Sequence, residues 1–292
     1  MSVLIRSDAS MKIGSGHLMR CLTLADQLKD MGAAVAFVCR DLPGGMFDLI
    51  QERGYLGVRF NMAVGGDGNQ QDDAVATINA ARGLFAESID WLVVDHYQLD
   101  VAWEKILRPH VRKVMVIDDL ANRQHACDLL LDQNYESTER YRDLVPENCN
   151  LLLGPKFALL RPEYSEYRKF MKPRNREMQR VLVYFGGSDD QNITGLAIEA
   201  LSERELRKLD VDVVIGANYQ HRERLVSQVN QRPKTIIYGP RLHLADLMAQ
   251  ADLAIGAGGV TNWERMCLGL PSLVIMMSKA VGKAQIYFEQ PC

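Results

Sequence analysis

The strongest constraint on the fold is a repeated alternation of short apolar segments with segments of helical periodicity. The run WLVV at 91–94 is entirely apolar, and VAWEKILRPH follows it with helical character. Over 17–30, apolar residues recur at the three- and four-residue spacing of a helix. Buried strands that alternate with helices are typical of parallel sheets joined by crossover helices. We therefore predict an α/β protein.

The alternation is interrupted once and then begins again. The segment 164–180, YSEYRKFMKPRNREMQR, is polar and basic, contains a proline and offers little to bury, and VLVYFGG then starts a second series of strands and helices. This pattern predicts two Rossmann-like domains whose parallel sheets face a central cleft. The boundaries are an N-terminal domain over 1–165, a linker over 166–180 and a C-terminal domain over 181–292. The cleft is the expected binding site.

Composition argues against several classes of function. The formal net charge of −3 provides no basic surface for a nucleic acid, and no apolar run approaches the roughly 18 residues that span a bilayer. The N-terminus lacks the order of a signal peptide, so we expect a cytoplasmic protein with neither nucleic acid nor membrane as a partner. None of the six cysteines is paired at metal-binding spacing, so buried free thiols are expected and zinc is not.

The first candidate site is KIGSGHLMR, at the junction of the first strand and its helix. Open α/β sheets bind ligands at this end of their strands, and Gly14 and Gly16 would let a ligand approach the backbone. His17 begins the helix, whose N-terminus disfavours an imidazolium. A neutral ring could accept a proton from water as a general base. The alternative is that His17 only caps its helix.

Two arginines near this loop are candidate phosphate ligands. Arg20 follows His17 by three residues on the same side of the helix, while Arg6 and Asp8 end the preceding strand. Either arginine could hold a phosphate or pair with Asp8, and for Arg6 the ion pair is slightly favoured.

A second strand ends in VVDHYQ, which places Asp95, His96 and Tyr97 at its carboxyl end. His96 could be a second base, and Tyr97 could provide a ring against which a sugar rests. The alternative is a buried polar strand end.

Further on, DDLANRQHACDLLLDQN has carboxylates dense enough to suggest a divalent cation. Because Arg123 lies among them and no metal-loop spacing is matched, a structural network of ion pairs is favoured.

The second half carries two glycine-rich loops that each follow a strand and precede a helix. In FGGSD, Ser188 or Asp189 could cap a helix that starts near Asn192, a geometry that suits a phosphate. In GAGGVTNWER, Glu264 lies one turn into the helix and could accept both hydroxyls of a ribose. The two loops predict a nucleotide site, with tight turns alone as the alternative. The other residues involved are Gly186, Gly187, Gly256, Gly258, Gly259 and Asn262.

Neither half contains the dinucleotide fingerprint, because position 19 is Met where the third glycine would stand. NAD is therefore not expected as a cofactor.

Several of these segments together resemble the PseG family from residue 3 to residue 276. They are RSDASMKIGSGHLMRCLTLA, DHYQLD, DDLANRQHACDLLLDQN, LLLGPKFALLRPEY, FGGSD and GAGGVTNWERMCLGLPSLVI. Members of this family are UDP-sugar hydrolases of pseudaminic acid biosynthesis, related to spore-coat polysaccharide proteins and to MurG-type glycosyltransferases. The resemblance implies a GT-B fold with UDP held mainly by the second domain. It also implies hydrolysis of UDP-2,4-diacetamido-2,4,6-trideoxy-β-L-altropyranose by water that attacks the anomeric carbon with inversion, with no metal or cofactor.

Individual roles also follow from the resemblance. It assigns the base to His17, places Tyr97 near the sugar, and gives nucleotide binding to Gly186, Gly187, Asn262 and Glu264, with Glu264 on the ribose. After LGLPSLVIMM the family continues with a polar loop and further helices, whereas this chain reads SKAVGKAQIYFEQPC. We therefore expect an incomplete or altered C-terminal domain with exposed apolar surface. A glycosyltransferase of the same fold and an inactive nucleotide-binding remnant are the alternative functions.

Overall fold

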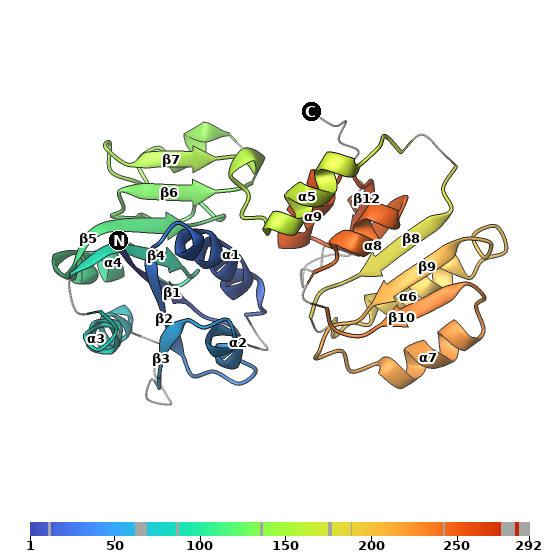
Figure 1. Ribbon diagram of the computed structural model, residues 1–292, viewed down its shortest axis with the longest axis horizontal. Coiled ribbons are helices and arrows are strands. Elements are labelled where there is room, and N and C mark those ends of the chain that lie inside the picture. Colours follow the sequence, from blue (N-terminus) through green and yellow to red (C-terminus); the bar gives the residue numbers. More distant parts are fainter. Residues whose placement is uncertain are drawn as a thin grey trace. The chain divides into compact units, whose positions relative to one another are not determined.

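The computed structural model describes residues 1–10, 13–61, 69–85, 88–134, 137–174, 177–187, 189–241, 243–275 and 284–285. The chain divides into two compact units, Met1–Leu159 and Leu160–Cys292 (Figure 1). Each unit contains its own sheet with helices packed against it.

The first unit is built on a seven-stranded sheet in which every pairing is parallel. Its order is β3-β2-β1-β4-β5-β6-β7, so the direction in which strands are added reverses between β1 and β4. Such a switch point leaves a crevice at the carboxyl ends of the two strands, where α/β proteins bind ligands. The strands are β1(Ser2–Ser7), β2(Ala34–Arg40), β3(Leu56–Phe60), β4(Ile89–Asp95), β5(Val111–Ile117), β6(Leu129–Asp132) and β7(Asn150–Leu153).

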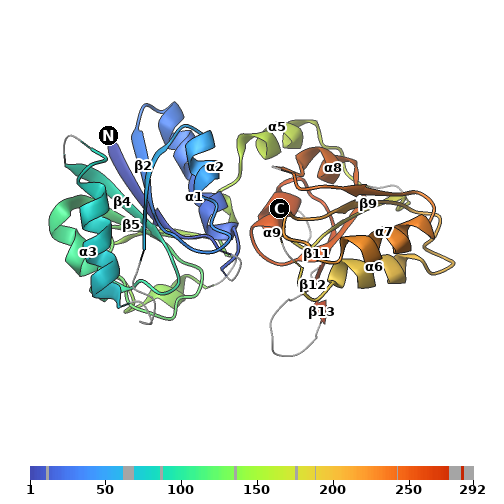
Figure 2. The same ribbon diagram turned by 90° about the horizontal axis from the view of Figure 1, so that it is seen from below.

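Helices cover both faces of this sheet because its central strands are apolar on both sides. In β1, Val3 and Ile5 pack into one buried cluster with residues of α1 and α2, while Leu4 packs into a second cluster with α3 and α4. Figure 2 shows α1 and α2 on one side of the strands and α3 on the other. The helices are α1(Gly16–Asp30), α2(Phe47–Glu52), α3(Gln70–Ala81) and α4(Val101–Leu107), with short 3-10 turns at Arg108–His110, Thr138–Tyr141 and Pro155–Phe157.

The alternation predicted the elements of this unit with two differences. Strand β7 was not predicted, because it has only four residues at the edge of the sheet and none of them is fully buried. The segment NMAVGGDGNQQDD at 61–73, whose glycines and polar residues predict a loop, is helical from Gln70 onward, and its residues 62–68 lie outside the described part of the chain.

The second unit has a sheet in the order β10-β9-β8-β11-β12-β13, with a switch point between β8 and β11. The first five strands are parallel, and β13 pairs antiparallel with β12. The alternation of strands and helices that the sequence predicts for this domain is confirmed up to β12. The strands are β8(Arg180–Tyr184), β9(Asp210–Val214), β10(Thr235–Tyr238), β11(Leu253–Ala257), β12(Ser272–Ile275) and β13(Ala284–Gln285), and the helices are α5(Pro162–Phe170), α6(Ile193–Leu201), α7(Arg222–Asn230), α8(Ala245–Gln250) and α9(Val260–Cys267).

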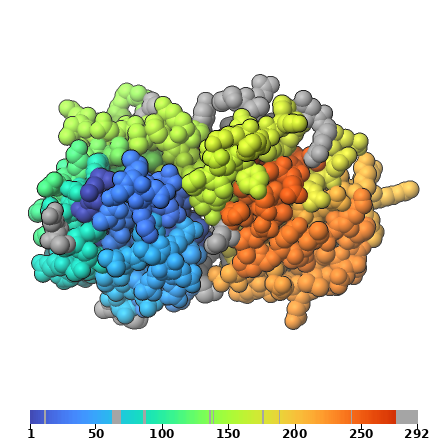
Figure 3. Space-filling view, viewed as in Figure 1, coloured from blue at the N-terminus to red at the C-terminus, as the bar shows by residue number. Residues whose placement is uncertain are grey.

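The boundary between the units lies after Leu159, earlier than the expected linker at 166–180. Residues 166–170 of the expected linker belong to α5, which packs on α8 and α9 and buries Tyr164 completely in the second core. Figure 3 shows the yellow-green α5 segment against the orange-red surface of α8 and α9. A single buried tyrosine thus makes the polar helix part of the second unit.

No helix among the described residues is long and apolar enough to cross a membrane. The unusual C-terminal segment SKAVGKAQIYFEQPC lies outside the described residues, except for the two residues of β13.

Candidate active site

The polar residues at the switch point of the first sheet form one connected cluster. Strand β1 ends at Ser7, which pairs in register with Asp95 at the end of β4. The loop after β1 leads to the N-terminus of α1, so that His17 and Arg20 reach the same edge of the sheet. The sequence order therefore brings side chains from three elements together at one point.

Asp95 and His17 form the centre of this cluster. Asp95 is fully buried, and its Oδ1 lies 2.6 Å from His17 Nδ1. Burial alone would raise the pKa of Asp95, but Arg20 and His17 outweigh it and hold that pKa well below its usual range. An ionised carboxylate at this distance requires a proton on Nδ1, because two acceptors would repel each other. When Nδ1 alone carries a proton, Nε2 is left as an acceptor.

Arg20 fixes the carboxylate from the other side. Its Nε donates to Asp95 Oδ2 at 2.5 Å, its Nη2 donates to Oδ1 at 2.6 Å, and its Nη1 donates to Asp119 Oδ2 at 2.9 Å. The sequence suggests either a phosphate or Asp8 as the partner of Arg20. The structure shows that it is buried against Asp95 and Asp119 instead.

Tyr97 lies beside the histidine, as expected for a residue of the same site. Its ring centroid is 4.4 Å from that of His17 and the two rings are nearly perpendicular, at 83°. Burial and the negative charge of the nearby Asp119 raise the pKa of Tyr97, which keeps its hydroxyl neutral. The side chain is 45% exposed, so one surface of the ring is accessible to a ligand.

The loop after β5 holds Asp119 in place. Ala121 has a positive φ of 47°, a conformation that is unfavourable for a residue with a Cβ. The Asp118 carboxylate accepts a hydrogen bond from Ala121 N at 2.9 Å and pairs with Arg123 at 2.8 Å. The carbonyl of Asp119 accepts from Arg140 Nη2 at 3.2 Å. The segment is thus a network of ion pairs, as favoured from the sequence, and no group of potential metal ligands is found within the described residues.

The two glycines before α1 have different environments. Gly14 has a φ of 82° and forms a backbone bridge to Ser10, while Gly16 is the first residue of α1. His17 does not act as the helix cap, since its Nδ1 is directed to Asp95. The alternative interpretation of His17 as a simple cap is therefore not supported.

Arg6 is a correction to the predicted set of substrate ligands. It is completely buried and lies between Asp8 and Asp73, at 2.5 Å and 2.7 Å. Burial is unfavourable for the guanidinium, but these two carboxylates outweigh it and raise its pKa further. A phosphate would have to displace one of them in the protein interior. The ion pair with Asp8, slightly favoured from the sequence, is present.

His96 is also engaged inside the unit. Its Nδ1 accepts from Gln98 N at 3.1 Å, while its Nε2 lies 2.8 Å from Arg40 Nη2 and 3.1 Å from Asp8 Oδ2. Burial lowers the pKa of His96 and keeps it neutral. His96 therefore fits the buried polar strand end rather than a second base.

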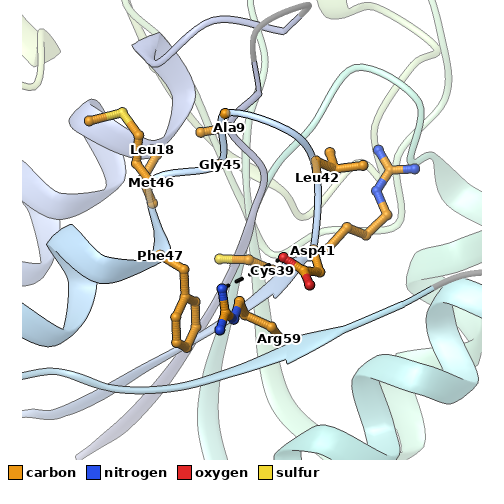
Figure 4. A pocket seen from close by; sticks show the side chains of 11 residues that line it. Ala9, Leu18, Cys39, Asp41, Leu42, Gly45, Met46, Phe47 and Arg59 are labelled. Atoms are coloured by element: carbon orange, nitrogen blue, oxygen red, sulfur yellow. Dashed lines mark ion pairs between the residues drawn. The ribbon is translucent and has the colours of Figure 1, made fainter. Parts of the chain in front are cut away.

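The first unit also contains a small pocket at the ends of β2 and β3. It has a volume of about 120 Å³ and is lined by residues such as Ala9, Phe47 and Arg59, with Asp41 and Arg59 paired at 3.7 Å (Figure 4). None of the predicted site residues is among those that line it. A volume of this size holds a few water molecules at most, so the pocket is not a nucleotide-sugar site.

In the second unit, the first glycine loop is closed by its own side chains. Asp189 accepts hydrogen bonds from Ile193 N at 2.9 Å and from Thr194 N at 2.8 Å, and Asn192 accepts from Gly195 N. The amides at the N-terminus of α6 are thus bonded to a carboxylate, in the position a phosphate would take. Ser188, the other cap considered, lies outside the described residues.

The glycines of this loop allow a tight turn. Gly186 has a φ of 91°, a conformation that glycine adopts without strain. The backbone of Gly187 comes so close to Gly216 that a Cβ on Gly216 would clash with it. No described atom lies within 4 Å of the positions that a Cβ on Gly186 or on Gly187 would take, so it is the carboxylate of Asp189, and not these two glycines, that occupies the helix amides.

The second glycine loop is different, because no described side chain caps α9. Gly259 has a φ of 110°, and no described atom lies within 4 Å of the position that its Cβ would take. Arg265 reaches back under the loop, where its Nη2 donates to Ala257 O at 2.8 Å and to the Asn262 side chain. Burial lowers the pKa of Arg265 to about 10. A buried cation therefore lies beneath an uncapped helix N-terminus.

Glu264 faces α5. It is largely buried, and its Oε1 lies 3.5 Å from Arg161 Nη2. Burial raises the pKa of Glu264, while Arg161 and a hydrogen bond to Tyr164 oppose the shift. The carboxylate predicted to bind ribose is thus held by the first residues of the second unit.

Comparison with known proteins gives three findings. The model of the glycosyltransferase family 28 C-terminal domain matches residues 181–290. The chain is 28% identical over 266 residues to the UDP-2,4-diacetamido-2,4,6-trideoxy-beta-L-altropyranose hydrolase of Campylobacter jejuni, which covers 90% of this chain and 87% of that protein. It is 25% identical over 288 residues to an uncharacterised protein of Methanocaldococcus jannaschii, which covers 96% of this chain but 56% of the relative. This chain therefore spans little more than half the length of the archaeal protein.

Among solved structures, MurG of Acinetobacter baumannii superposes with a TM-score of 0.58 at 16% identity, over 96% of this chain and 80% of that one. Together with the two Rossmann-like sheets, this likeness shows that the chain has a glycosyltransferase-like GT-B fold, as predicted. Within that class, the second unit is similar to the C-terminal domain of glycosyltransferase family 28.

Proposed function

We propose that this chain processes a UDP-sugar in polysaccharide biosynthesis, and that it is a hydrolase in which His17 is the general base. The similarity to the Campylobacter jejuni hydrolase over most of both chains supports the substrate class. The contact between His17 and the buried Asp95 is the single observation that carries the role of the base. The sugar we propose is the diacetamido-trideoxy-altropyranose of that relative.

The proposed reaction begins with a water molecule hydrogen-bonded to His17 Nε2. As its oxygen attacks the anomeric carbon, Nε2 takes one proton, the bond from that carbon to the phosphate oxygen breaks, and UDP leaves with the bonding pair. The configuration at the anomeric carbon inverts. Asp95 keeps the proton on Nδ1 and stabilises the imidazolium that forms, which is how a carboxylate assists a histidine base. Arg20 holds this carboxylate in place and keeps it ionised.

Tyr97 and Asp119 complete the proposed sugar side of the site. The exposed part of the Tyr97 ring could pack on the sugar, and the nearby Asp119 keeps the tyrosine hydroxyl protonated. Asp119 also receives Arg20 Nη1. It is therefore proposed as a positioning residue for Arg20.

For the nucleotide, we place the diphosphate at α9 and not at α6. The amides of α6 are already bonded to Asp189, whereas no described side chain caps α9. A helix N-terminus attracts phosphate, and the buried guanidinium of Arg265 adds positive charge below it. Glu264, one turn along α9, is then suited to accept the ribose hydroxyls.

A glycosyltransferase is the second candidate function. Its support is the match of residues 181–290 to a glycosyltransferase domain and the superposition on MurG. In that case an acceptor hydroxyl would replace water, and His17 would deprotonate it in the same way.

UDP release from the purified chain tests the proposal. With the altropyranose nucleotide and no acceptor, we expect multiple turnovers, and His17→Ala should reduce them to background while UDP still binds. His110→Gln is the matched control, because His110 is an exposed histidine of the same unit and should leave turnover unchanged. A folded chain that binds UDP but turns over only after an acceptor sugar is added would favour the transferase instead.

A further inference from the structure

A pair of cysteines lies at the start of β6 and β7, apart from the candidate active site. Cys127 Sγ and Cys149 Sγ are 3.6 Å apart. Cys127 is buried and Cys149 is half-buried. A disulfide needs its two sulfurs at about 2.05 Å, so a small rotation of the two side chains would bring them into bonding distance.

The backbone already holds the two cysteines in this relationship. On one side of the pair, His125 N donates to Leu144 O at 2.8 Å, and on the other, Asn150 N donates to Asp128 O at 2.9 Å. The two segments are therefore joined by hydrogen bonds both before and after the cysteines. These hydrogen bonds hold the two cysteine segments side by side.

We propose that Cys127 and Cys149 are a thiol oxidation site that closes to an intramolecular disulfide on contact with a peroxide. The half-exposed Cys149 is the thiol that the oxidant reaches, and the buried Cys127 is the thiol that resolves the product. This site is independent of the proposed sugar chemistry.

The chemistry balances in two steps. The Cys149 thiolate attacks one oxygen of hydrogen peroxide, the O–O bond breaks, and after uptake of one proton the products are a Cys149 sulfenic acid and water. The Cys127 sulfur then attacks the sulfenic sulfur, the S–O bond breaks, and water leaves with the Cys127 proton. The two thiols lose two electrons in total, which reduce the peroxide to water.

The environment of the two sulfurs supports this division of roles. A hydrogen bond from Cys127 lowers the pKa of Cys149, against the opposing effects of burial and of Asp128 and Glu104. By contrast, burial raises the pKa of Cys21 and of Cys39, which lie inside the same unit. Exposure and thiolate character decide which cysteine an oxidant attacks, and Cys149 is the more exposed of the pair.

The disulfide would close a loop that contains structural supports of the candidate site. Residues 128–148 include Asn134, Arg140 and Tyr141, whose side chains bond to Asp118, Asp119 or Asp132. Restricting this segment in the unfolded state stabilises the folded one. Oxidation should therefore raise the Tm of the protein by several degrees.

Peptide mapping after oxidation tests the proposal. Trypsin releases Cys127 in the peptide 124–140 and Cys149 in the peptide 143–156. After treatment with hydrogen peroxide and alkylation of free thiols, we expect these peptides to be linked and two hydrogens lighter than their sum. Dithiothreitol should separate them again. Two separately alkylated peptides after complete peroxide treatment, or links between different chains, would overturn the proposal.

Three variants assign the two roles. In Cys127→Ala, Cys149 should accumulate as a sulfenic acid that dimedone traps, and peroxide should no longer raise the Tm. In Cys149→Ser, neither the trapped acid nor the link should form. Cys267→Ser is the matched control, because Cys267 is a half-buried cysteine of the other unit, and it should form the link as the unchanged protein does. Equal trapping at Cys149 with and without Cys127 would contradict the resolving role.

Discussion

Asp95 Oδ1 lies 2.6 Å from His17 Nδ1, and the two residues are separated by 77 others in the chain. The carboxylate is fully buried and is held ionised by Arg20. A buried, ionised carboxylate fixes both the orientation and the tautomer of the ring that it contacts. The reactive character of His17 therefore depends on a residue from another strand.

The first prediction concerns Asp95→Asn. The asparagine oxygen can still accept from Arg20, which turns the amide N–H toward His17 Nδ1. The ring proton then moves to Nε2, and the acceptor that water needs is lost. We expect kcat for UDP release to fall by roughly 10³- to 10⁴-fold, with the Kd for UDP unchanged by calorimetry. Asp48→Asn, at an exposed position in the same unit, is the control. A folded Asp95→Asn protein with near-normal kcat would exclude the proposed pair.

The second prediction concerns the ribose contact at Glu264. In Glu264→Gln the side chain keeps its shape but loses its charge, so UDP binding should weaken by about 1.5–3 kcal/mol, or roughly tenfold to 100-fold in Kd. The value of kcat at saturating substrate should change little. Glu199→Gln, exposed on α6, should bind UDP normally.

Glu264 should also make UDP binding depend on pH. Burial raises the pKa of this carboxyl above its ordinary value, and the ribose hydroxyls donate best to the ionised form. As pH falls toward the raised pKa, protonation removes the acceptor and Kd should increase, beginning at a higher pH than for an ordinary glutamate. Titration calorimetry across this range should show the increase in the unchanged protein and a flat response in Glu264→Gln. Identical profiles for the two proteins would assign the ribose to another residue.

The sequence predicted the alternating elements well because each depends on a local pattern. The contact between Asp95 and His17 could not be predicted in the same way, since it depends on the sheet order that places β4 beside β1. Arg6 is the reverse case, because the sequence suggested it as a substrate ligand and the structure buries it in an ion pair. A strand-end arginine has the same local pattern whether it meets a phosphate or, as here, Asp73 from α3.

The two glycine loops show a further limit of pattern alone. FGGSD and GAGGVTNW both indicate a turn before a helix, but only the first places a carboxylate on the helix amides. The signal was present in Asp189 itself, because an acidic cap competes with a phosphate for the same donors. In the sequence, Asp119 is only one carboxylate of a dense segment, and its ion pair with Arg20 depends on the fold.

Stability at acid pH provides the third prediction. Burial alone would raise the pKa of Asp8, but Arg6 and His96 hold it well below its usual range. A carboxyl with a depressed folded pKa contributes stability above its unfolded pKa of about 3.9, and that contribution is lost as pH falls below it. Urea unfolding followed by circular dichroism should show that the free energy of unfolding falls below about pH 4.

Asp8→Asn should be less stable at neutral pH by about 3–5 kcal/mol and should lose less of its free energy of unfolding on acidification. An exposed variant, Asp30→Asn, should follow the unchanged protein. An acid response of Asp8→Asn as steep as that of the unchanged protein would contradict the role of Asp8.

The fourth prediction separates the two helix N-termini. Asp189→Ala removes the carboxylate that accepts from Ile193 N and Thr194 N, so the free energy of unfolding should fall by about 1–2 kcal/mol. If the diphosphate binds at α9 as proposed, the Kd for UDP should stay within a factor of two or so of normal, since only the cap of α6 is lost. A clear tightening of UDP binding would mean that Asp189 competes with the phosphate, and the nucleotide would then belong at α6.

The last prediction concerns the strained residue beside Asp119. Ala121 has a φ of 47°, which costs an alanine roughly 1–2 kcal/mol. Glycine adopts this conformation freely but loses about 0.5–1 kcal/mol through its more flexible unfolded state. Ala121→Gly should therefore raise the free energy of unfolding by about 0.5–1 kcal/mol, measured by urea denaturation. The matched control Ala200→Gly, at an exposed position in α6, should instead lower it by about 1 kcal/mol. Equal destabilisation by both glycines would show that Ala121 is not strained. The loop would then be held by its hydrogen bonds alone, among them those of Asp118 and of Arg140.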